Sequence, residues 1–397
     1  MDYVIRLSRE KVKKTQTSFQ RFLIDKIDWS WRLNAILGAR GAGKTTLLLQ
    51  QMKKTHAKGD TAVYASLDDY YFTENRLYQF VDDMRAKGYT HFFLDEVHKY
   101  QGWARELKNI YDSIPDVNIT FTGSSILEIL KQEVDLSRRS VGYYLPELSF
   151  REFLKLAHDI HFESHSLEDI VNNSWQIASD IVQEIKPLVH FQEYLAFGAY
   201  PYYLENKNLY HERLQKTIRL IIESDLQFIE GYNPQNANKI NKLLYILANN
   251  VPFKPNITKL SERIGTTRNT VIQYLNYLEK ASIIHSLHPQ GSSVSTLQKP
   301  EKTLLRNPNL AYAISPEFVN TGSLRESFFV SQLSVGHSVE THSSADFTID
   351  NKYVFEVGGK NKSSKQIKGL PSSYLAIDDV ENAVGNSIPL WLFGLLY

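Results

Sequence analysis

The chain has 397 residues, with 45 Lys and Arg residues against 44 Asp and Glu residues, and it contains no cysteine. The near-neutral charge excludes a global field that draws the whole chain to nucleic acid, and the lack of cysteine excludes disulfides and cysteine-ligated metals. The length predicts two to four domains, the charged start has no signal-peptide core, and no apolar run is long enough to span a bilayer, so we expect a cytoplasmic protein without membrane contact.

The first 150 residues alternate between short apolar runs and helical-looking segments. The expected strands are Leu33–Leu37, Thr61–Leu67, His91–Leu94, Val117–Thr122 and Val141–Leu145. The expected helices are Lys44–His56, Glu74–Lys87, Trp103–Ser113 and Ile126–Gln132. This alternation predicts an α/β fold with a parallel, doubly wound sheet, and ligands of such sheets bind beyond the carboxyl ends of the strands.

The turn between the first strand and the first helix, GARGAGKT, fits the phosphate-loop pattern G-x-x-x-x-G-K-S/T. Glycine lets backbone N–H groups approach a phosphate closely, and the following helix adds its N-terminal dipole. We expect Lys44 to reach the β and γ phosphates of ATP and Thr45 to ligate Mg²⁺. The candidate nucleotide-binding residues are Gly38, Ala39, Arg40, Gly41, Ala42, Gly43, Lys44, Thr45 and Thr46. The alternative is a glycine turn before an ordinary helix.

A second motif, FLDE, ends the apolar run at His91–Leu94 with two adjacent carboxylates. Burial alone does not explain them, because unpaired carboxylates are costly to bury. We expect Asp95 to hold Mg²⁺ and Glu96 to activate the attacking water, as in a Walker B strand. The strand Thr61–Leu67 lies between the two motifs in sequence, which suits the P-loop branch with a catalytic glutamate, where an added strand separates them.

Polar residues also follow two neighbouring strands. In NITFTGSS, Ser124 or Thr122 is a candidate sensor of the γ-phosphate; the alternative is a helix cap. Asp68 and Asp69 end the strand Thr61–Leu67, and we interpret them as a turn and helix cap rather than as groups near magnesium.

After residue 150 the pattern changes twice. Residues 151–235 are helical and rich in Tyr and Phe, which predicts a helical lid and linker. Residues 236–298 predict a winged helix, with helices Thr258–Ile264 and Thr267–Lys280 around a Gly265 turn and a β wing at Ile283–Leu297. The open alternatives for this module are protein interaction and DNA binding. The candidate DNA-contacting residues are Thr266, Thr267, Arg268, Asn269 and Gln273, with Lys254, Lys259 and Arg263 adding positive charge.

Residues 299–397 predict a further α/β domain. We expect a helix at Leu324–Leu333, two strands around an Asp350-Asn351 turn, and a core strand in SIPLWLFGLLY at the C-terminus. Asp346 and Glu356 lie on the two strands of the hairpin, and paired carboxylates of this kind can hold a divalent metal for phosphodiester cleavage.

Several segments together resemble the prokaryotic AAA-type ATPases of the archaeal-type branch of the AAA+ superfamily, which join a P-loop core, a winged helix and a C-terminal domain. They are RLNAILGARGAGKTTLLLQ, VYASLDDYYF, FLDEVHKY, TGSS, LPELSFREFL, YLAFGAYP, RESFFVSQL and DFTIDNKYVFEVGGKNKSSKQI. The resemblance implies catalytic roles for Lys44, Glu96 and Ser124, and an arginine finger acting across a subunit interface at Arg139; a surface charge is the alternative for Arg139.

The C-terminal domain is similar to the PD-(D/E)XK restriction-endonuclease-like fold. The resemblance matches Glu326 and Gln366 to flanking positions of such nucleases. The chain departs from the pattern at Gly358, where an E-x-K motif places lysine, and Lys360 is a candidate substitute. We therefore expect a domain that binds without cleaving.

These observations predict an ATP-hydrolysing molecular switch with ATP and Mg²⁺ as cofactors. The alternatives are an ATP-regulated DNA nuclease and a nucleotide-dependent DNA-binding regulator. The expected partners are ATP and ADP, with DNA at the winged helix, a protein partner or a homo-oligomer left open.

Overall fold

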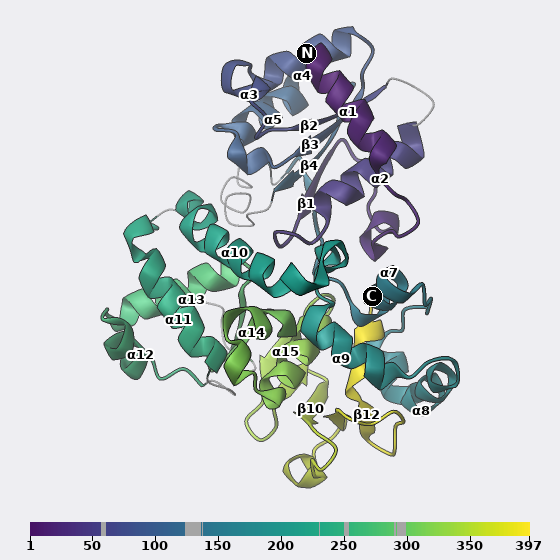
Figure 1. Ribbon diagram of the computed structural model, residues 1–397, viewed down its shortest axis with the longest axis vertical. Helices are drawn as coiled ribbons and strands as arrows, with labels where there is room; N and C mark the ends of the chain where they lie inside the picture. Colours follow the sequence, from purple (N-terminus) through teal and green to yellow (C-terminus); the bar gives the residue numbers. More distant parts are fainter. Residues whose placement is uncertain are drawn as a thin grey trace. The chain divides into compact units, whose positions relative to one another are not determined.

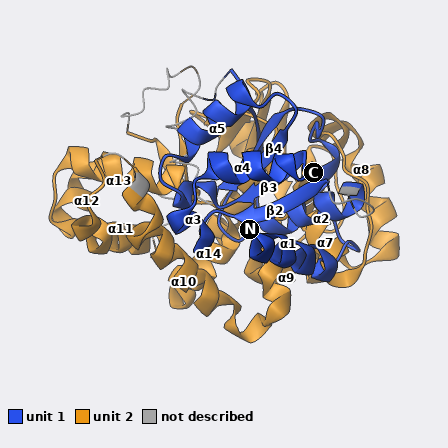
Figure 2. Ribbon diagram, turned by 90° about the horizontal axis from the view of Figure 1, so that it is seen from above, with its two compact units in different colours: residues 1–147 blue, residues 148–397 orange. Residues whose placement is uncertain are grey.

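The chain forms two compact units, Met1–Glu147 and Leu148–Tyr397, in a computed structural model (Figure 2). The described residues are 1–56, 61–123, 136, 138–229, 231–249, 254–289, 291 and 299–397. The boundary between the units lies three residues before the end of the expected P-loop core at residue 150. The second unit takes in the expected lid, winged-helix and C-terminal regions.

The first unit is built on a sheet of five parallel strands, which confirms the predicted α/β fold (Figure 1). The strands are β1 (Leu33–Leu37), β2 (Ala62–Ser66), β3 (His91–Asp95), β4 (Asn118–Gly123) and β5 (Val141–Tyr144). Their order is β2-β3-β4-β1-β5. An added strand therefore separates β1 from β3, as expected for the branch with a catalytic glutamate. That strand is β4, whereas β2, which lies between them in sequence, is at the edge of the sheet.

Helices cover both faces of this sheet. They are α1 (Asp2–Lys14), α2 (Lys44–His56), α3 (Tyr71–Glu74), α4 (Leu77–Ala86) and α5 (Trp103–Ser113). The α2 helix packs Leu47, Leu48 and Met52 onto one face, and α4 and α5 pack onto the other. The expected helix Glu74–Lys87 is divided by Asn75, whose backbone is extended. The expected helix Ile126–Gln132 lies outside the described residues.

The N-terminal helix α1 has no counterpart among the expected elements. It lies along the edge strand β2, where the Ser8 hydroxyl accepts a hydrogen bond from the Tyr64 N–H at 2.9 Å. Lys11 of the same helix stands over the Tyr64 ring. The helix thereby covers an edge whose free backbone groups would otherwise be open to pairing with another chain.

The second unit begins with helices and continues into two separate sheets. Its helices are α7 (Phe150–His158), α8 (Leu167–Glu184), α9 (Pro187–Phe197), α10 (Tyr210–Glu223), α11 (Ala237–Asn249), α12 (Ile257–Ile264), α13 (Arg268–Lys280), α14 (Pro308–Ile314) and α15 (Thr321–Leu333). The α12 and α13 helices match their expected ranges to within one residue. Gly265 between them is left-handed, with φ 66°, as the expected turn requires.

A two-stranded antiparallel sheet follows α13. It pairs β6 (Ile284–Leu287) with β7 (Lys302–Leu305). The second strand therefore lies beyond the range 283–297 that the sequence assigned to the wing, and it falls within the expected C-terminal domain. Residue 290 and residues 292–297 of that range are outside the described residues.

The larger sheet of the second unit has the order β12-β11-β10-β9-β8. Its strands are β8 (Val339–Thr341), β9 (Phe347–Ile349), β10 (Tyr353–Gly358), β11 (Ser373–Ile377) and β12 (Ser387–Pro389). The hairpin β9–β10 turns at Asp350 and Asn351, both with positive φ, as a two-residue turn of this type requires. The α15 helix packs against this sheet through Phe329, which contacts Phe347 and Phe355.

The C-terminal apolar run is only partly a strand. After β12 the chain forms a 3₁₀ helix at Leu390–Leu395, all of it buried. The prediction of a core strand was wrong for these six residues, because a short continuous apolar run does not distinguish a buried strand from a buried helix. Gly394 allows the close packing here, since a Cβ on it would lie 2.4 Å from the Cβ of Phe150.

Candidate nucleotide-binding site

The phosphate loop runs from the end of β1 to the first residue of α2. Gly38 has φ 153°, and a Cβ there would lie 2.2 Å from the Leu145 carbonyl oxygen, so only glycine fits. Gly41 and Gly43 have φ of 85° and 98°, which other residues rarely adopt. The structure thus brings all nine predicted loop residues to the carboxyl end of β1, with Thr46 exposed on α2.

The Lys44 ammonium lies inside the loop. Its Nζ donates to the carbonyl oxygens of Gly38 and Ala39 at 2.9 and 2.8 Å, and the residue is 4% exposed. Arg21 holds the loop from outside: it is equally buried and donates to the Ala42 carbonyl at 2.6 Å. The same guanidinium donates to the carbonyls of Pro146 and Glu147. No motif marks Arg21 in the sequence, and its role depends on contacts between distant segments.

Asp95 is the centre of a buried hydrogen-bond cluster at the carboxyl end of β3. Its carboxylate accepts from the Thr45 hydroxyl at 2.7 Å, from the Tyr64 hydroxyl at 2.8 Å, and from the Thr122 hydroxyl. Burial, together with the Asp95 charge, raises the pKa of Tyr64, so this hydroxyl remains a donor. Tyr64 was not predicted, and Thr122 was predicted only as an alternative to Ser124.

Glu96 sits in a left-handed conformation, with φ 52°, which is uncommon for a residue other than glycine. Its N–H donates to the Thr122 hydroxyl at 3.2 Å, so Thr122 links the Asp95 carboxylate to the Glu96 backbone. The Glu96 side chain is 24% exposed, and its Oε2 lies 3.4 Å from Nε2 of the buried His98. Burial and the nearby cations of Lys99, Lys44 and Arg40 lower the pKa of His98 to about 3, so this imidazole is neutral.

The residues predicted to hold Mg²⁺ fit that ion. Thr45 and Asp95 present a hydroxyl and a carboxylate to each other across 2.7 Å, and Mg²⁺ prefers oxygen ligands of this kind. The donors around Asp95 are uncharged hydroxyls, so its negative charge is not cancelled by an ion pair with them.

The remaining predicted residues of this unit lie elsewhere. Ser124 is outside the described residues. Arg139 forms a two-point pair with Asp112, with Nε to Oδ1 at 2.8 Å and Nη2 to Oδ2 at 2.9 Å. It precedes β5, whose last residue Tyr144 lies opposite Leu37. Arg139 therefore lies toward the end of the sheet opposite the phosphate loop of its own chain.

Asp68 and Asp69 make the contacts expected of a turn. Asp69 accepts from the Tyr71 N–H at 2.9 Å and Asp68 accepts from the Ser66 hydroxyl at 2.6 Å. They line a cavity of about 590 Å³ whose other side includes Lys99 and Tyr100.

In the second unit, five charged residues form a compact cluster. Lys302 lies 2.7 Å from the Glu326 carboxylate and 3.1 Å from that of Asp346. Lys362 pairs with Glu356, which is 2% exposed. Burial is the main cause that raises the pKa of both Glu326 and Glu356. The structure therefore brings the predicted carboxylates together and pairs them with lysines, although Oε2 of Glu356 has no hydrogen-bond partner among the described residues.

Lys362, and not the predicted candidate Lys360, is the lysine that pairs with Glu356. A Cβ on Gly358 would lie 2.6 to 2.8 Å from three carbons of the Lys362 side chain, so this side chain fills the space beside Gly358. Lys360 and Gln366 are exposed. The sequence analysis therefore missed Lys362 as the partner of Glu356. The adjacent glycines Gly358 and Gly359 were the signal in the sequence that a side chain could pack close to the backbone here.

The residues predicted to contact DNA divide into two groups. Arg268 and Asn269 are exposed at the start of α13. Thr267 caps that helix by accepting from the Thr270 N–H, and Gln273 donates to the Tyr277 hydroxyl. Only the first group is presented to a partner without breaking a contact within the chain.

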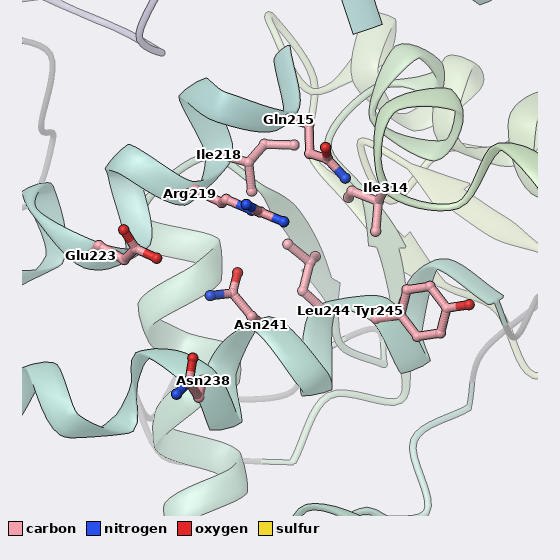
Figure 3. Close-up of a pocket in the computed structure, with 9 residues that line it drawn as sticks. All are labelled: Gln215, Ile218, Arg219, Glu223, Asn238, Asn241, Leu244, Tyr245 and Ile314. Atoms are coloured by element: carbon pink, nitrogen blue, oxygen red, sulfur yellow. The ribbon is translucent and has the colours of Figure 1, made fainter. Parts of the chain in front are cut away.

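Figure 3 shows a second cavity, of about 420 Å³, between α10 and α11. Arg219 and Glu223 project into it from α10, and Asn241 and Tyr245 from α11. The residues that line this cavity include a positive and a negative side chain, neutral amides and apolar side chains, so the cavity indicates no single ligand chemistry.

Comparisons with known proteins agree with the geometry of the first unit. Residues 30–154 match a family model described as "AAA domain", and residues 188–320 match one described as a domain of unknown function, DUF8612. The first unit, with its five-stranded parallel sheet and phosphate loop, is therefore similar to an AAA domain over residues 30–147, and the match continues to residue 154.

Two relatives are themselves uncharacterised proteins. One, from Methanocaldococcus jannaschii, is 28% identical over 373 residues, covering 84% of this chain and 76% of its own. The other, from Haemophilus influenzae, is 23% identical over 276 residues, covering 64% and 61%. A solved structure of AMPPCP-bound DnaA from Aquifex aeolicus has a TM-score of 0.27 and 17% identity, covering 70% of this chain and 88% of that one, a likeness too low to support any argument.

Across the described parts of the chain, no helix is both long enough and apolar enough to cross a membrane.

Proposed function

We propose that the chain is an ATP-hydrolysing molecular switch. The observation that carries the proposal is the hydrogen-bonded cluster at the carboxyl edge of the first sheet, where the loop also holds Lys44. In this cluster Asp95 accepts from the hydroxyls of Thr45 and Thr122, and Thr122 accepts from the Glu96 N–H. These are the groups needed to bind a nucleoside triphosphate with its metal and to direct a water at the γ-phosphate.

The chemistry follows from the positions of these groups. Thr45 and Asp95 would hold Mg²⁺, which would supply positive charge to the phosphate oxygens. Lys44 exchanges its two backbone carbonyl contacts for phosphate oxygens, and its charge then stabilises the charge that develops on them. Glu96 accepts a hydrogen bond from the attacking water and orients it. His98 beside Glu96 is neutral, so it does not add a positive charge next to this carboxylate.

ATP turnover by two variants tests the proposal. Lys44→Ala removes a group that contacts the nucleotide and should abolish tight ATP binding. Glu96→Gln should retain binding and slow turnover by about 10² or more, the usual cost of losing a general base. Glu96→Gln with wild-type turnover would show that the Walker B assignment is wrong.

We further propose that α11, α12, α13 and the β6–β7 pair form a winged helix. The tight Gly265 turn and the antiparallel pair that follows α13 support this assignment. The exposed Arg268 and Asn269 favour DNA as a second ligand of the switch, and Lys259 and Arg263 of α12 are also exposed. Salt-dependent duplex binding that weakens in Arg268→Ala tests this; equal affinity in that variant would leave protein interaction as the role of the module.

For the C-terminal sheet we propose a restriction-endonuclease-like fold that does not cleave. The sheet of β8 to β12, which contains both parallel and antiparallel pairs, and the packing of α15 against this sheet support the fold. The pairing of Lys302 and Lys362 with the three carboxylates opposes cleavage, because a metal ion would have to displace ammonium groups that already pair with these carboxylates. Cleavage of DNA with Mg²⁺ or Mn²⁺ that disappears in Glu356→Ala but survives Glu96→Gln would overturn this assignment.

A further inference from the structure

The second unit holds a group of metal-ligating side chains that the proposed function does not use. His158, His190 and Glu193 each place one ligand atom within 4.8 Å of the other two. The His158 Nε2 lies 3.1 Å from the Glu193 Oε2, and the two imidazole rings are 4.5 Å apart between centroids. The group is distinct from the Walker cluster, which belongs to the first unit.

Two packed helices fix these positions. His158 is the last residue of α7, and His190 and Glu193 are three residues apart on α9, which places them on one face of that helix. The Phe153 ring of α7 packs against both His158 and Tyr194 of α9. Figure 1 shows α7 and α9 in the second unit. The spacing of the ligands therefore depends on a buried aromatic contact rather than on mobile surface side chains.

The protonation states suit a metal. Burial and the neighbouring His158 lower the pKa of His190, so its ring has a lone pair available near neutral pH. The pKa of Glu193 is also lowered: burial opposes this, but the hydrogen bond from Lys207 and the nearby charges outweigh it. A neutral imidazole and an ionised carboxylate are the forms that bind a metal.

Lys207 holds one oxygen of the carboxylate and leaves the other to the histidines. Its Nζ lies 2.5 Å from Oε1 of Glu193, whereas Oε2 faces His158. Carboxylates that ligate metals are themselves commonly hydrogen-bonded in this way. The side chains of His158 and Glu193 are 27% and 25% exposed, so an ion can reach them from solvent.

We propose that His158, His190 and Glu193 form a binding site for a borderline transition-metal ion, with Zn²⁺ as the ion that the two-imidazole, one-carboxylate set fits. A tetrahedral ion with bonds of about 2.1 Å spaces its ligand atoms about 3.4 Å apart, so the side chains need only small rotations to close on it. Three protein ligands leave a fourth position for water or for a group from another molecule. Imidazole ligands disfavour Mg²⁺ and Ca²⁺ at this site.

Titration of the full-length, untagged protein with Zn²⁺ tests the proposal, with excess Mg²⁺ present to occupy oxygen-only sites. We expect one tight equivalent, and with Co²⁺ the visible absorption of a four-coordinate ion. Glu193→Gln, which preserves size, and His190→Ala should each weaken binding at least about 10-fold, since even losing an outer partner of a ligand has such a cost. His161→Ala is the matched control, because His161 is exposed and close in sequence to His158; it should bind like the wild type.

Two outcomes would overturn the proposal. One is the absence of a stoichiometric equivalent in the wild type. The other is unchanged affinity in Glu193→Gln and His190→Ala, with circular dichroism showing that both variants are folded. ATP turnover by the wild type without Zn²⁺ is a separate measurement, so failure of the metal site and failure of the proposed ATPase are distinguished.

Discussion

Replacing Thr122 by valine tests the contact that joins the Asp95 carboxylate to the Glu96 backbone. The change keeps the shape of a fully buried side chain and removes only its hydroxyl. That hydroxyl donates to Asp95 and accepts from the Glu96 N–H at 3.2 Å. Asp95 retains two donors, Thr45 and Tyr64, whereas the Glu96 N–H loses this acceptor at a residue that is already in an unfavourable left-handed conformation.

The expected losses follow from that geometry. A buried donor left without its acceptor lowers the free energy of unfolding by about 1–3 kcal/mol. A displaced water-orienting group lowers kcat by about 10²-fold even when the displacement is near 1 Å. The affinity for ATP should be nearly unchanged, because Lys44 and the loop amides are not touched.

Three measurements check this: steady-state ATP turnover, equilibrium binding of a fluorescent ATP analogue, and urea unfolding. Thr120→Val is the matched control, since Thr120 is buried two residues earlier on the same face of β4. It should leave kcat unchanged. If Thr122→Val turns over ATP like the wild type, Thr122 does not position Glu96, and the argument from the shared hydroxyl fails.

Three further predictions concern single positions. Arg139→Ala should lower kcat by about 10³-fold at protein concentrations that favour assembly if the arginine acts across a subunit interface. Asp112→Asn is its control and should not lower kcat; equal small losses of stability in both variants, with unchanged turnover, would assign the pair a structural role. Burial raises the pKa of Glu356. The stability that its protonated form provides is therefore present below the ordinary pKa of about 4.3 and is lost as the pH rises through the pKa of the folded state. Thermal unfolding should show that Glu356→Gln is more stable than the wild type at neutral pH but not in acid. Gly38→Ala should abolish ATP binding, whereas Gly102→Ala, which meets no neighbour and adds only a strained φ, should cost about 1–2 kcal/mol of stability and leave binding intact; ATP binding by Gly38→Ala would refute the steric argument.

The first unit was largely predictable because its signals are local. The expected strands agree with β1 to β5 to within one residue at each end, since each is a short apolar run bounded by turn residues. The glycine spacing similarly predicts the loop, because its conformation depends on neighbours in sequence. The Gly265 turn and the Asp350-Asn351 hairpin were predictable for the same reason.

Contacts between distant segments were not predictable. Tyr64 reaches Asp95 only because β2 pairs with β3 in a particular register, with Ser66 opposite Asp95. Arg21 is in a segment without hydrophobic periodicity, and its role in holding the phosphate loop depends on three backbone carbonyls that the fold brings together. A single sequence does not specify such pairings, so the two residues were missed although their types are ordinary.

The two carboxylate clusters show why residue type alone does not locate a divalent cation. Asp95 is surrounded by hydroxyl donors, which satisfy its oxygens without cancelling its charge. Around Glu356 the partners are ammonium groups, and two lysines face three carboxylates, two of which have a raised pKa. A cation gains electrostatic energy at the first cluster, whereas at the second it must displace cations that are already there. The sequence shows paired carboxylates in both places, and we expect the identity of the neighbouring donors to decide which pair binds a metal.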